Sequence, residues 1–398
     1  MNKFIQSIIH FSLRHRYFIF FLTGVLTFIG IWSYKNTPIE TFPDVTNTQI
    51  IIITQWPGRS AEEVEKFITI PLETELNSVQ KRINLRTNSS FGLSYITLIF
   101  DDNVDDAFAR QQVMSRIINA DLPDGVKPEV QPPYGPTGEI YRYTLQSSIT
   151  NIRELTAIQD WVIDRQFKSV PGVADVNTFG GEEKIFEVSA NPELLVKYNL
   201  SPFDVYNAIA RSNVNVGGDV IQKNGQAYVV RGIGILNNID EINNIIIDKV
   251  NNVPILVKNV ATVTESRKPR LGTVAKDGVP NQVEGIVVMR KGENPSEVLD
   301  RLHLKVKELN EHILPADVRI IPFYDRTNLM DYATETVIHN LIEGIILVTI
   351  IVMLFMADWR TTVTVSIIIP LSLLFAFICM RIKGMNANLL SMGAVDFG

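Results

Sequence analysis

Residues 337–398 constrain this chain most, because they hold two long apolar runs separated by only four residues. Residues 337–356 are apolar after Glu343, and residues 361–380 contain no charged side chain. A helix of about 20 apolar residues is long enough to cross the hydrocarbon core of a bilayer. The pattern therefore predicts two membrane-spanning helices, at 337–356 and 361–380, joined by a tight turn.

A third apolar stretch begins near residue 388 and contains one carboxylate, Asp396. The stretch 388–398 is too short to span a bilayer. We therefore expect it to be the start of a further spanning helix, and the chain to be the front part of a larger membrane protein. A charged group at membrane depth costs at least a few kcal/mol and is usually retained for a function, which makes Asp396 a candidate functional residue.

The N-terminus predicts another membrane helix. Residues 1–16 form a short amphipathic stretch, expected to be an interfacial helix on the cytoplasmic side. Residues 17–34 are uncharged, and no small-residue cleavage site follows them, so 17–35 is interpreted as an uncleaved span. Arg14 and Arg16 favour a cytoplasmic N-terminus, whereas Arg381 and Lys383 fall in a short outer loop and oppose this orientation.

Composition excludes several classes of function. The net charge is −6, and because 1–35 is basic and 337–398 is balanced, the acidic surplus lies in residues 36–336. An acidic region argues against nucleic acid as a partner. The only cysteine, Cys379, falls inside a predicted span, so a Cys-based metal site is not expected. No phosphate-binding glycine motif or nucleophile–base motif is found, so we expect no bound cofactor and no ATP-driven or enzymatic chemistry.

Residues 36–132 have the pattern of a first α+β lobe. Strands are predicted at 48–55, 83–88 and 93–100 and from 126, with a helix after Ser60 and another over 104–120. Ser60 and Glu63 form a capping box at the start of the first helix. The order β-α-β-β-α-β is that of a ferredoxin-like unit. The residues expected on the buried faces of the two helices are Val64, Phe67, Ile68, Leu72, Leu76, Phe108, Val113, Ile117 and Ile118.

A second lobe is predicted from residues 133–184 and 271–330, after a proline-rich linker. Its closing segment, LPADV at 314–318, resembles LPDGV at 122–126, which indicates a weak internal repeat. Residues 185–270 interrupt this lobe and are rich in asparagine. Gly217-Gly218 and Asn224-Gly225 favour a hairpin there. Two interpretations remain open for the insertion: an arm that contacts another subunit, or an ordinary surface loop.

Several motifs spread over the whole chain resemble those of resistance–nodulation–division efflux pumps, in the order found in that family. The motif GAVDFG at 393–398 and the fit of EIY at 139–141 are similar to the heavy-metal branch of the cobalt–zinc–cadmium type. The other matching stretches are NTPIETFPD at 36–44, WPGRS at 56–60, VPGVADV at 170–176, GG at 180–181 and FYDR at 323–326.

The resemblance implies a homotrimer in the bacterial inner membrane with residues 36–336 in the periplasm. It also implies work with a periplasmic adaptor protein and an outer-membrane channel. The expected function is proton-driven efflux of divalent cations of the cobalt, zinc, cadmium and nickel class, by a secondary active transporter. Two alternatives remain: an exporter of organic amphiphiles from the same family, and a membrane-anchored periplasmic sensor.

The same resemblance gives Asp396 the role of a proton relay, because a carboxyl group in the membrane can exchange a proton between the two sides. In the lobes, carboxylate oxygens are the candidate metal ligands, because oxygen ligands suit borderline divalent ions in part. We select Glu139, at the joint between the lobes, and Asp175, after the turn at 171–172, as metal ligands. The alternative for each is a surface salt bridge or a turn residue.

Other polar residues favour structural roles. His303 and His312 are nine positions apart, which is not a ligand spacing. The scattered methionines of the lobes, Met114, Met289 and Met330, give no support for a thioether path for Cu(I) or Ag(I). His339 and Glu343 share a helix face and are expected to pair near the membrane surface. The acidic residues at 101–106 fall at a predicted helix N-terminus, where the helix dipole favours them.

Overall fold

The computed structural model describes residues 2–37, 39–40, 46–250, 252–270, 272–384 and 387–388. The chain divides into two compact units. Unit 1 comprises Met1–Gln146, Ile163–Thr178 and Glu284–Gly398, and unit 2 comprises Ser147–Val162 and Phe179–Val283.

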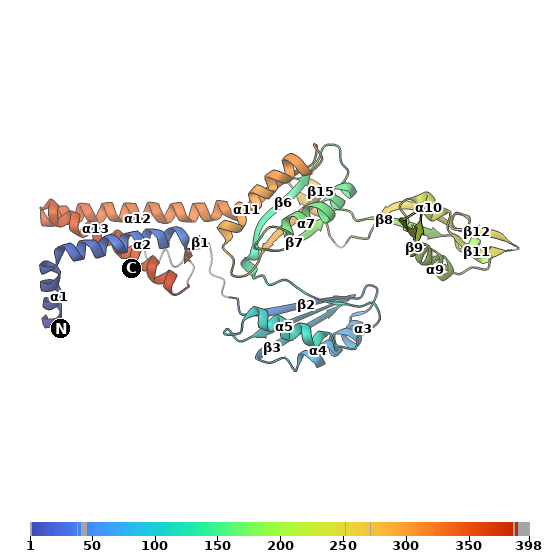
Figure 1. The fold of residues 1–398 in the computed structure, drawn as a ribbon, viewed down its shortest axis with the longest axis horizontal. Helices are drawn as coiled ribbons and strands as arrows, with labels where there is room; N and C mark the ends of the chain where they lie inside the picture. Colours follow the sequence, from blue (N-terminus) through green and yellow to red (C-terminus); the bar gives the residue numbers. More distant parts are fainter. Residues whose placement is uncertain are drawn as a thin grey trace. The chain divides into compact units, whose positions relative to one another are not determined.

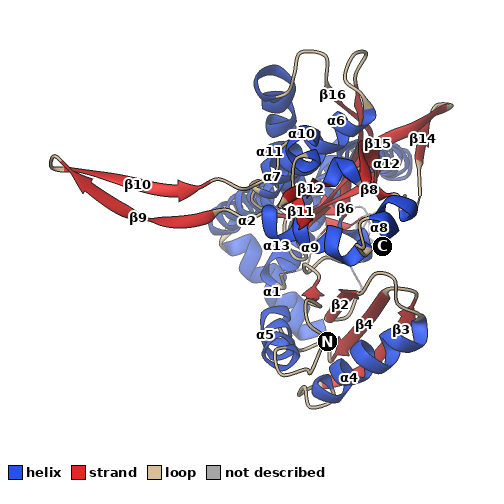
Figure 2. Cartoon of the chain, turned by 90° about the vertical axis from the view of Figure 1, so that its right-hand side faces the viewer, coloured by secondary structure: helices blue, strands red, loops and turns tan. Residues whose placement is uncertain are grey.

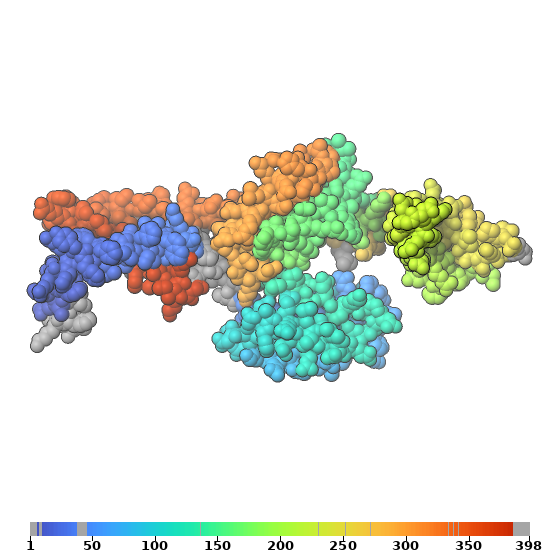
Figure 3. All heavy atoms as spheres, viewed as in Figure 1, coloured from blue at the N-terminus to red at the C-terminus, as the bar shows by residue number. Residues whose placement is uncertain are grey.

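Among the described residues of unit 1, three helices are long and apolar enough to cross a membrane: α2 (Arg16–Asn36), α12 (Arg326–Met356) and α13 (Trp359–Ile382). α13 packs against both α2 and α12, and the three run alongside one another (Figures 1 and 3). A hydrogen bond of 2.7 Å joins Thr349 Oγ1 of α12 to Ser366 Oγ of α13. The amphipathic helix α1 (Asn2–Arg14) precedes α2, and strand β1 (Ile39–Glu40) pairs in parallel with β17 (Ala387–Asn388).

The turn between α12 and α13 is built by two residues. Ala357 adopts a left-handed conformation with φ of 49° and ends α12. Asp358 then caps α13, because its carboxylate accepts hydrogen bonds from the backbone N–H groups of Arg360 and Thr361. Satisfying these N–H groups lets the second helix start at once. The tight turn between two apolar helices is therefore confirmed.

The first lobe has the element order β-α-β-β-α-β. Its antiparallel sheet has the strand order β3-β4-β2-β5. The helix after Ser60 contains one π-helical turn, and the predicted capping box with Glu63 is present. The elements are β2 (Gln49–Gln55), α3 (Ala61–Val64), η1 (Glu65–Thr69), α4 (Ile70–Leu76), β3 (Arg82–Ser90), β4 (Leu93–Phe100), α5 (Asp106–Ile117) and β5 (Pro128–Val130).

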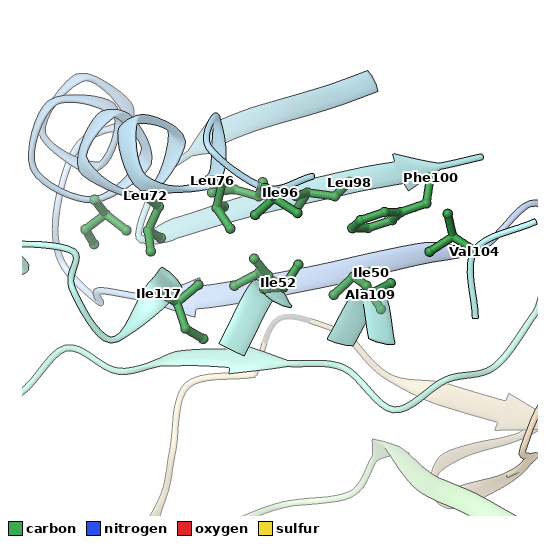
Figure 4. Close-up of a cluster of buried hydrophobic side chains, with 13 residues drawn as sticks. Ile50, Ile52, Leu72, Leu76, Ile96, Leu98, Phe100, Val104, Ala109 and Ile117 are labelled. Carbon is green, nitrogen blue, oxygen red and sulfur yellow. The ribbon is translucent and has the colours of Figure 1, made fainter. Parts of the chain in front are cut away.

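One face of this sheet packs against the helices and forms the core of the lobe (Figure 4). Strand residues at every second position are buried there, among them Ile50, Ile52, Ile96, Leu98 and Phe100, as the two-residue period of a strand requires. From the helices, Val64, Ile68, Leu72, Leu76, Val113 and Ile117 are buried as predicted.

Three aromatic or branched residues were wrongly expected in that core. Phe67 is 45% exposed, Phe108 36% and Ile118 81%. Phe67 lies in the π-helical turn, which changes the angle between successive side chains, and its ring packs edge-on against Trp56 instead. Ile118 keeps a right-handed helical conformation at the C-cap of α5. The helical period places it about 100° around the helix from the buried Ile117, on the side of the exposed Met114.

The second lobe contains a five-stranded sheet in the order β14-β15-β6-β16, in which β7 also pairs with β15. Large aromatic side chains fill its core, and Tyr143 packs edge-on against Phe167. The elements are η2 (Pro136–Gly138), β6 (Glu139–Gln146), α6 (Ile152–Ile158), η3 (Gln159–Ile163), α7 (Asp164–Lys168), β7 (Val173–Gly180), β14 (Val274–Lys276), β15 (Val279–Met289), α11 (Pro295–Glu308), η5 (Leu309–Ile313) and β16 (Arg319–Asp325).

The insertion in unit 2 is neither a simple loop nor only an arm, because it has a hydrophobic core of its own. Leu195, Val205, Ile242 and Val257 are among its buried residues. Its elements are β8 (Lys184–Ala190), α8 (Pro192–Lys197), α9 (Pro202–Ser212), α10 (Ile239–Asn243), β11 (Ile246–Val250), β12 (Val253–Leu256), η4 (Val257–Asn259) and β13 (Ala261–Arg267).

The predicted hairpin is present within this insertion. β9 (Val216–Lys223) and β10 (Gln226–Gly232) pair antiparallel and project as an isolated two-stranded ribbon (Figure 2). Asn224 and Gly225 both have positive φ, of 54° and 76°, as a two-residue hairpin turn of this type requires. All residues of β9 are exposed.

Candidate functional site

Asp175 is held by the turn at Pro171-Gly172 that precedes β7. Gly172 has a φ of 94°, and a Cβ atom there would collide with Val298, so the turn requires glycine. The carbonyl of Gly172 accepts a hydrogen bond from the backbone of Arg290, and that of Pro171 accepts one from the Arg301 side chain. The turn is thus fastened to two neighbouring segments, which fixes the position of Asp175.

The Asp175 carboxylate is engaged by Lys168 of α7. Lys168 Nζ lies 2.7 Å from Asp175 Oδ1 and 3.1 Å from Asp164 Oδ1. The backbone N–H of Val176 also donates to Asp175 Oδ1. Partial burial opposes the charged form of Lys168, but hydrogen bonds to Asp175 and Asp164 outweigh it and raise its pKa. Lys168 is therefore cationic at neutral pH.

Glu139 begins β6 and is less firmly paired. Its Oε2 lies 4.0 Å from Arg142 Nη1, and its side chain is half-exposed. Arg142 is mainly the partner of Glu284, a buried carboxylate whose Oε1 lies 2.8 Å from Arg142 Nη2 and 2.9 Å from Nε. Glu284 takes the close contacts of Arg142. Of Glu139 and Glu284, Glu139 therefore has the carboxylate that is more available to another partner.

A cavity of about 490 Å³ adjoins Glu139 in unit 1. Glu139 is the acidic residue in its lining, which also includes two arginines. Two positive groups and one negative group do not favour a cation inside this cavity. The lining residues are Thr137, Glu139, Arg142, Phe323, Tyr324, Arg326 and Leu329.

Tyr134 lies within electrostatic range of both selected carboxylates. Burial raises the pKa of the Tyr134 phenol, and the neighbouring phenol of Tyr95 and the carboxylates of Asp175 and Glu139 raise it further. Asn177 shares a hydrogen bond with the same phenol. The fold therefore brings Glu139 and Asp175, which are far apart in the sequence, to the surroundings of one phenol group.

Several other predicted polar residues have structural partners. His303 Nε2 lies 2.6 Å from Asp325 Oδ2, and Asp325 also caps α12 through the Thr327 backbone. Asp105 caps α5 by accepting from the Phe108 backbone, and Asp106 lies in the first turn of that helix, which confirms the helix-terminus interpretation for these two acidic residues; Asp101 instead accepts hydrogen bonds from Asn103. His312 is exposed and lies 4.0 Å from Glu311.

The long apolar helix α12 carries one of the predicted pairs. His339 Nδ1 and Glu343 Oε1 are 3.5 Å apart on α12, and both side chains are exposed in the single chain. Asp396 lies outside the described residues. Within the described part of the chain, no group of three or more His, Cys, Asp or Glu side chains is arranged to hold a metal ion.

Sequence reasoning missed Lys168, Arg142 and Tyr134, which surround the two selected carboxylates. Lys168 and Asp164 are spaced four apart on a helix, and this spacing was a usable signal for a pair. The contact of Lys168 with Asp175 depends on the fold, because α7 and β7 are joined by the fixed turn at 171–172.

The comparisons with known proteins define the class of protein. A model of the AcrB/AcrD/AcrF family matches residues 8–398. The chain belongs to this family of resistance–nodulation–division efflux pumps. Its relatives lie in the heavy-metal branch, which confirms the resemblance seen in the sequence motifs.

Individual relatives are similar over nearly the whole chain. Protein HelA of Legionella pneumophila is 38% identical over 403 residues, covering 99% of this chain and 38% of that protein. The cobalt-zinc-cadmium resistance protein CzcA of Cupriavidus metallidurans is 37% identical over 407 residues, with coverage of 99% and 38%. The crystal structure of a heavy metal efflux pump matches with a TM-score of 0.90 and 39% identity, covering 98% of this chain and 39% of that one. The chain thus spans about two fifths of the length of these relatives.

Proposed function

We propose that this chain is the N-terminal part of an inner-membrane pump that exports divalent heavy-metal cations of the cobalt, zinc, cadmium and nickel class. The observation that carries the proposal is the 37% identity over 99% of the chain to a cobalt-zinc-cadmium resistance protein. The structural match to a heavy metal efflux pump supports it.

Proton antiport is the proposed energy source, with Asp396 as a relay. A carboxyl group in the membrane core has its pKa raised by the loss of water, so it can bind and release a proton near neutral pH. Asp396 follows two helices that are apolar enough to span. The pump is then a secondary active transporter that uses no resident cofactor.

Glu139 and Asp175 are proposed as metal ligands along the periplasmic path. The half-exposed Glu139 carboxylate supports this role, as does the Asp175 carboxylate, which already holds one cation, the Lys168 ammonium group. Two oxygen ligands bind a divalent ion weakly, so further donors from the rest of the pump would complete the site. Weak binding suits a transported ion, which must leave the site again.

The proposed architecture places residues 36–336 in the periplasm and the helices α2, α12 and α13 in the inner membrane. The sheet order β3-β4-β2-β5 and the element order of the first lobe support a ferredoxin-like class for the lobes. We further propose that the pump is a homotrimer whose subunits contact one another through the hairpin β9–β10. The trimer works with a periplasmic adaptor protein and an outer-membrane channel.

The decisive experiment uses the full-length protein in proteoliposomes with an imposed proton gradient. Zn²⁺ transport should depend on the gradient and should be abolished in Asp396→Asn, which keeps the size of the side chain but removes its titration. Expression and trimer formation should be unchanged. Gradient-dependent Zn²⁺ transport by the Asn variant would remove Asp396 from the mechanism.

The second candidate function is export of organic amphiphiles, since the matching family model takes its description from AcrB, AcrD and AcrF. The same proteoliposomes distinguish the two. An organic cationic dye that is transported while Zn²⁺ is not would favour this alternative over metal export.

A further inference from the structure

Lys168 places a positive charge directly on the Asp175 carboxylate. Its ammonium group lies 2.7 Å from Asp175 Oδ1 and 3.1 Å from Asp164 Oδ1, so two carboxylates converge on one cation. Asp164 and Asp175 are about one-fifth exposed, whereas the Lys168 side chain is 45% exposed. We call Asp164, Lys168 and Asp175 the lysine clamp.

We propose that Lys168 is a tethered competitor for the metal ion at Asp175, which lowers the affinity of the site and helps the ion to leave. This inference rests on the proposed role of Asp175 as a metal ligand. When a divalent cation binds, the ammonium group gives up Asp175 Oδ1 and moves toward water while keeping its pair with Asp164. When the cation leaves, Lys168 returns and neutralises Asp175.

The chemistry of the lysine side chain suits this exchange. A lysine ammonium is a compact charge on a flexible four-carbon stem, so it can swing away without moving the backbone. Its exposed position lets water replace the lost hydrogen bond. A competitor that is part of the chain is always present at the site, whatever the concentration of free cations.

The backbone around the clamp supports motion of the side chain alone. Asp164 and Lys168 lie on one face of α7 as an i,i+4 pair, and Asp175 is fixed by the turn at 171–172. The pair with Asp164 retains the ammonium close by while Asp175 is occupied. Asp175 Oδ1 receives both described contacts, from Lys168 and from the Val176 backbone, so a cation can first approach through Oδ2.

The test measures Zn²⁺ affinity of the full-length protein in detergent, without a proton gradient, by competition with a chromophoric chelator. Lys168→Gln should bind Zn²⁺ about fivefold more tightly, the gain expected from removing one partly exposed ion pair. Lys168→Arg, which keeps the charge and the pairing, should stay close to the wild type. Lys305→Gln is the matched control, because Lys305 forms a 2.7 Å pair with Glu308 on α11 of the same unit, and its affinity should not change.

The double variant Lys168→Gln/Asp175→Asn separates competition from a general effect on the fold. The fivefold gain should vanish in the Asp175→Asn background, even if Lys168→Gln also lowers the melting temperature. If Asp175→Asn weakens Zn²⁺ binding but Lys168→Gln leaves it unchanged or weaker, Lys168 is no competitor and the metal site stands. If Asp175→Asn has no effect on Zn²⁺ binding, Asp175 is not a metal ligand, and the proposed competition by Lys168 fails as well.

Discussion

At the scale of single residues, Gly172 is one of the positions in the described chain that require glycine. It has a φ of 94°, and a Cβ atom would also meet Val298. Gly172→Ala should lower the free energy of unfolding by about 2–4 kcal/mol, through backbone strain and overpacking together. The check is thermal unfolding of the solubilised protein.

Gly58 supplies the control for this prediction. Its φ is 81°, but no atom lies within 4 Å of the Cβ position. Gly58→Ala therefore introduces strain without a collision, and we expect a loss of about 1 kcal/mol. Equal losses for the two variants would show that the contact with Val298 is readily relieved.

Glu182 is the most heavily paired carboxylate of unit 2. It is 7% exposed, and Arg267 Nη1 lies 2.7 Å from its Oε1. Arg153, Arg270 and Asn281 also contact it. Burial alone would raise the pKa of Glu182, but hydrogen bonds from Arg267, Asn281 and Arg153 reverse the effect and lower the pKa below its usual value of 4.5.

A lowered pKa in the folded state makes the stability depend on pH in one direction. The ionised Glu182 stabilises unit 2 above the unfolded-state pKa, and this contribution is lost as the pH falls through the folded-state pKa. The melting temperature of the wild type should therefore decrease as the pH is lowered from 4.5. Glu182→Gln should lower the melting temperature at pH 7 and show a smaller further fall in acid. Parallel pH profiles of the two proteins would contradict this assignment.

Local pairs could be predicted from the sequence, whereas pairs across the fold could not. The capping box of Ser60 and Glu63 is confirmed because both residues lie within one helical turn. Lys168 and Asp175 meet only because a fixed turn joins their helix and strand. Glu182 and Arg267 are 85 positions apart, so no local rule could connect them.

At the scale of elements, Gly30 sets how closely α2 and α13 approach. A Cβ atom at Gly30 would lie 2.6 Å from Leu374 Cβ of α13. Close packing of helices in lipid depends on such small residues. Gly30→Ala should destabilise the helix pair by about 1–3 kcal/mol. Gly24→Ala on the same helix, where nothing lies within 4 Å, should leave the melting temperature of the solubilised protein unchanged.

The hairpin β9–β10 is the element most suited to contact another copy of the chain. It leaves apolar side chains exposed on both strands, including Val220, Ile221 and Val229. Removing the hairpin and joining Asn215 to Ile233 through a short glycine linker should weaken the trimer and leave the core of the insertion folded. Native mass spectrometry measures the first effect and circular dichroism the second. An unchanged trimer would mean that subunits associate through other surfaces.

Most strands and helices follow from the periodicity of apolar residues, and the exceptions have local causes. The π-helical turn at Glu65–Thr69 changes the helical period where Phe67 lies, so a regular period assigned that side chain to the wrong face. The insertion was harder to predict, since its core is assembled from elements far apart in the sequence.

At the scale of the whole molecule, the orientation in the membrane stays a prediction. Arg381, which opposed it, donates a 2.8 Å hydrogen bond to the Asn36 carbonyl and lies 4.1 Å from the centre of the Trp32 ring. Its charge therefore has a role in joining the ends of α2 and α13. The presence of Arg381 in the proposed outer loop, against the rule that basic residues stay inside, thus has a structural explanation.

Cysteine labelling of spheroplasts tests the proposed orientation of the chain in the membrane. In a Cys379→Ser background, an impermeant reagent applied to spheroplasts should label Asn224→Cys and spare Asp358→Cys. The reason is that residue 224 is the tip of the hairpin, whereas Asp358 begins α13 at the proposed cytoplasmic turn. The reverse labelling pattern would invert the proposed topology.

The pairing of β8 with β13 has a consequence for how many residues the chain can carry between these two strands. The two strands match from Lys184 opposite Arg267 to Ala190 opposite Ala261, so the chain leaves and re-enters the second lobe at one place. Closing the loop between them is therefore already achieved by the strand pair, and each doubling of the enclosed length adds only about 0.6 kcal/mol of closure entropy. Exposed loops within residues 191–260 can accordingly be lengthened while the lobe that carries Asp175 keeps its own contacts, whereas the core of the insertion must be kept because Val263 of β13 is buried in it.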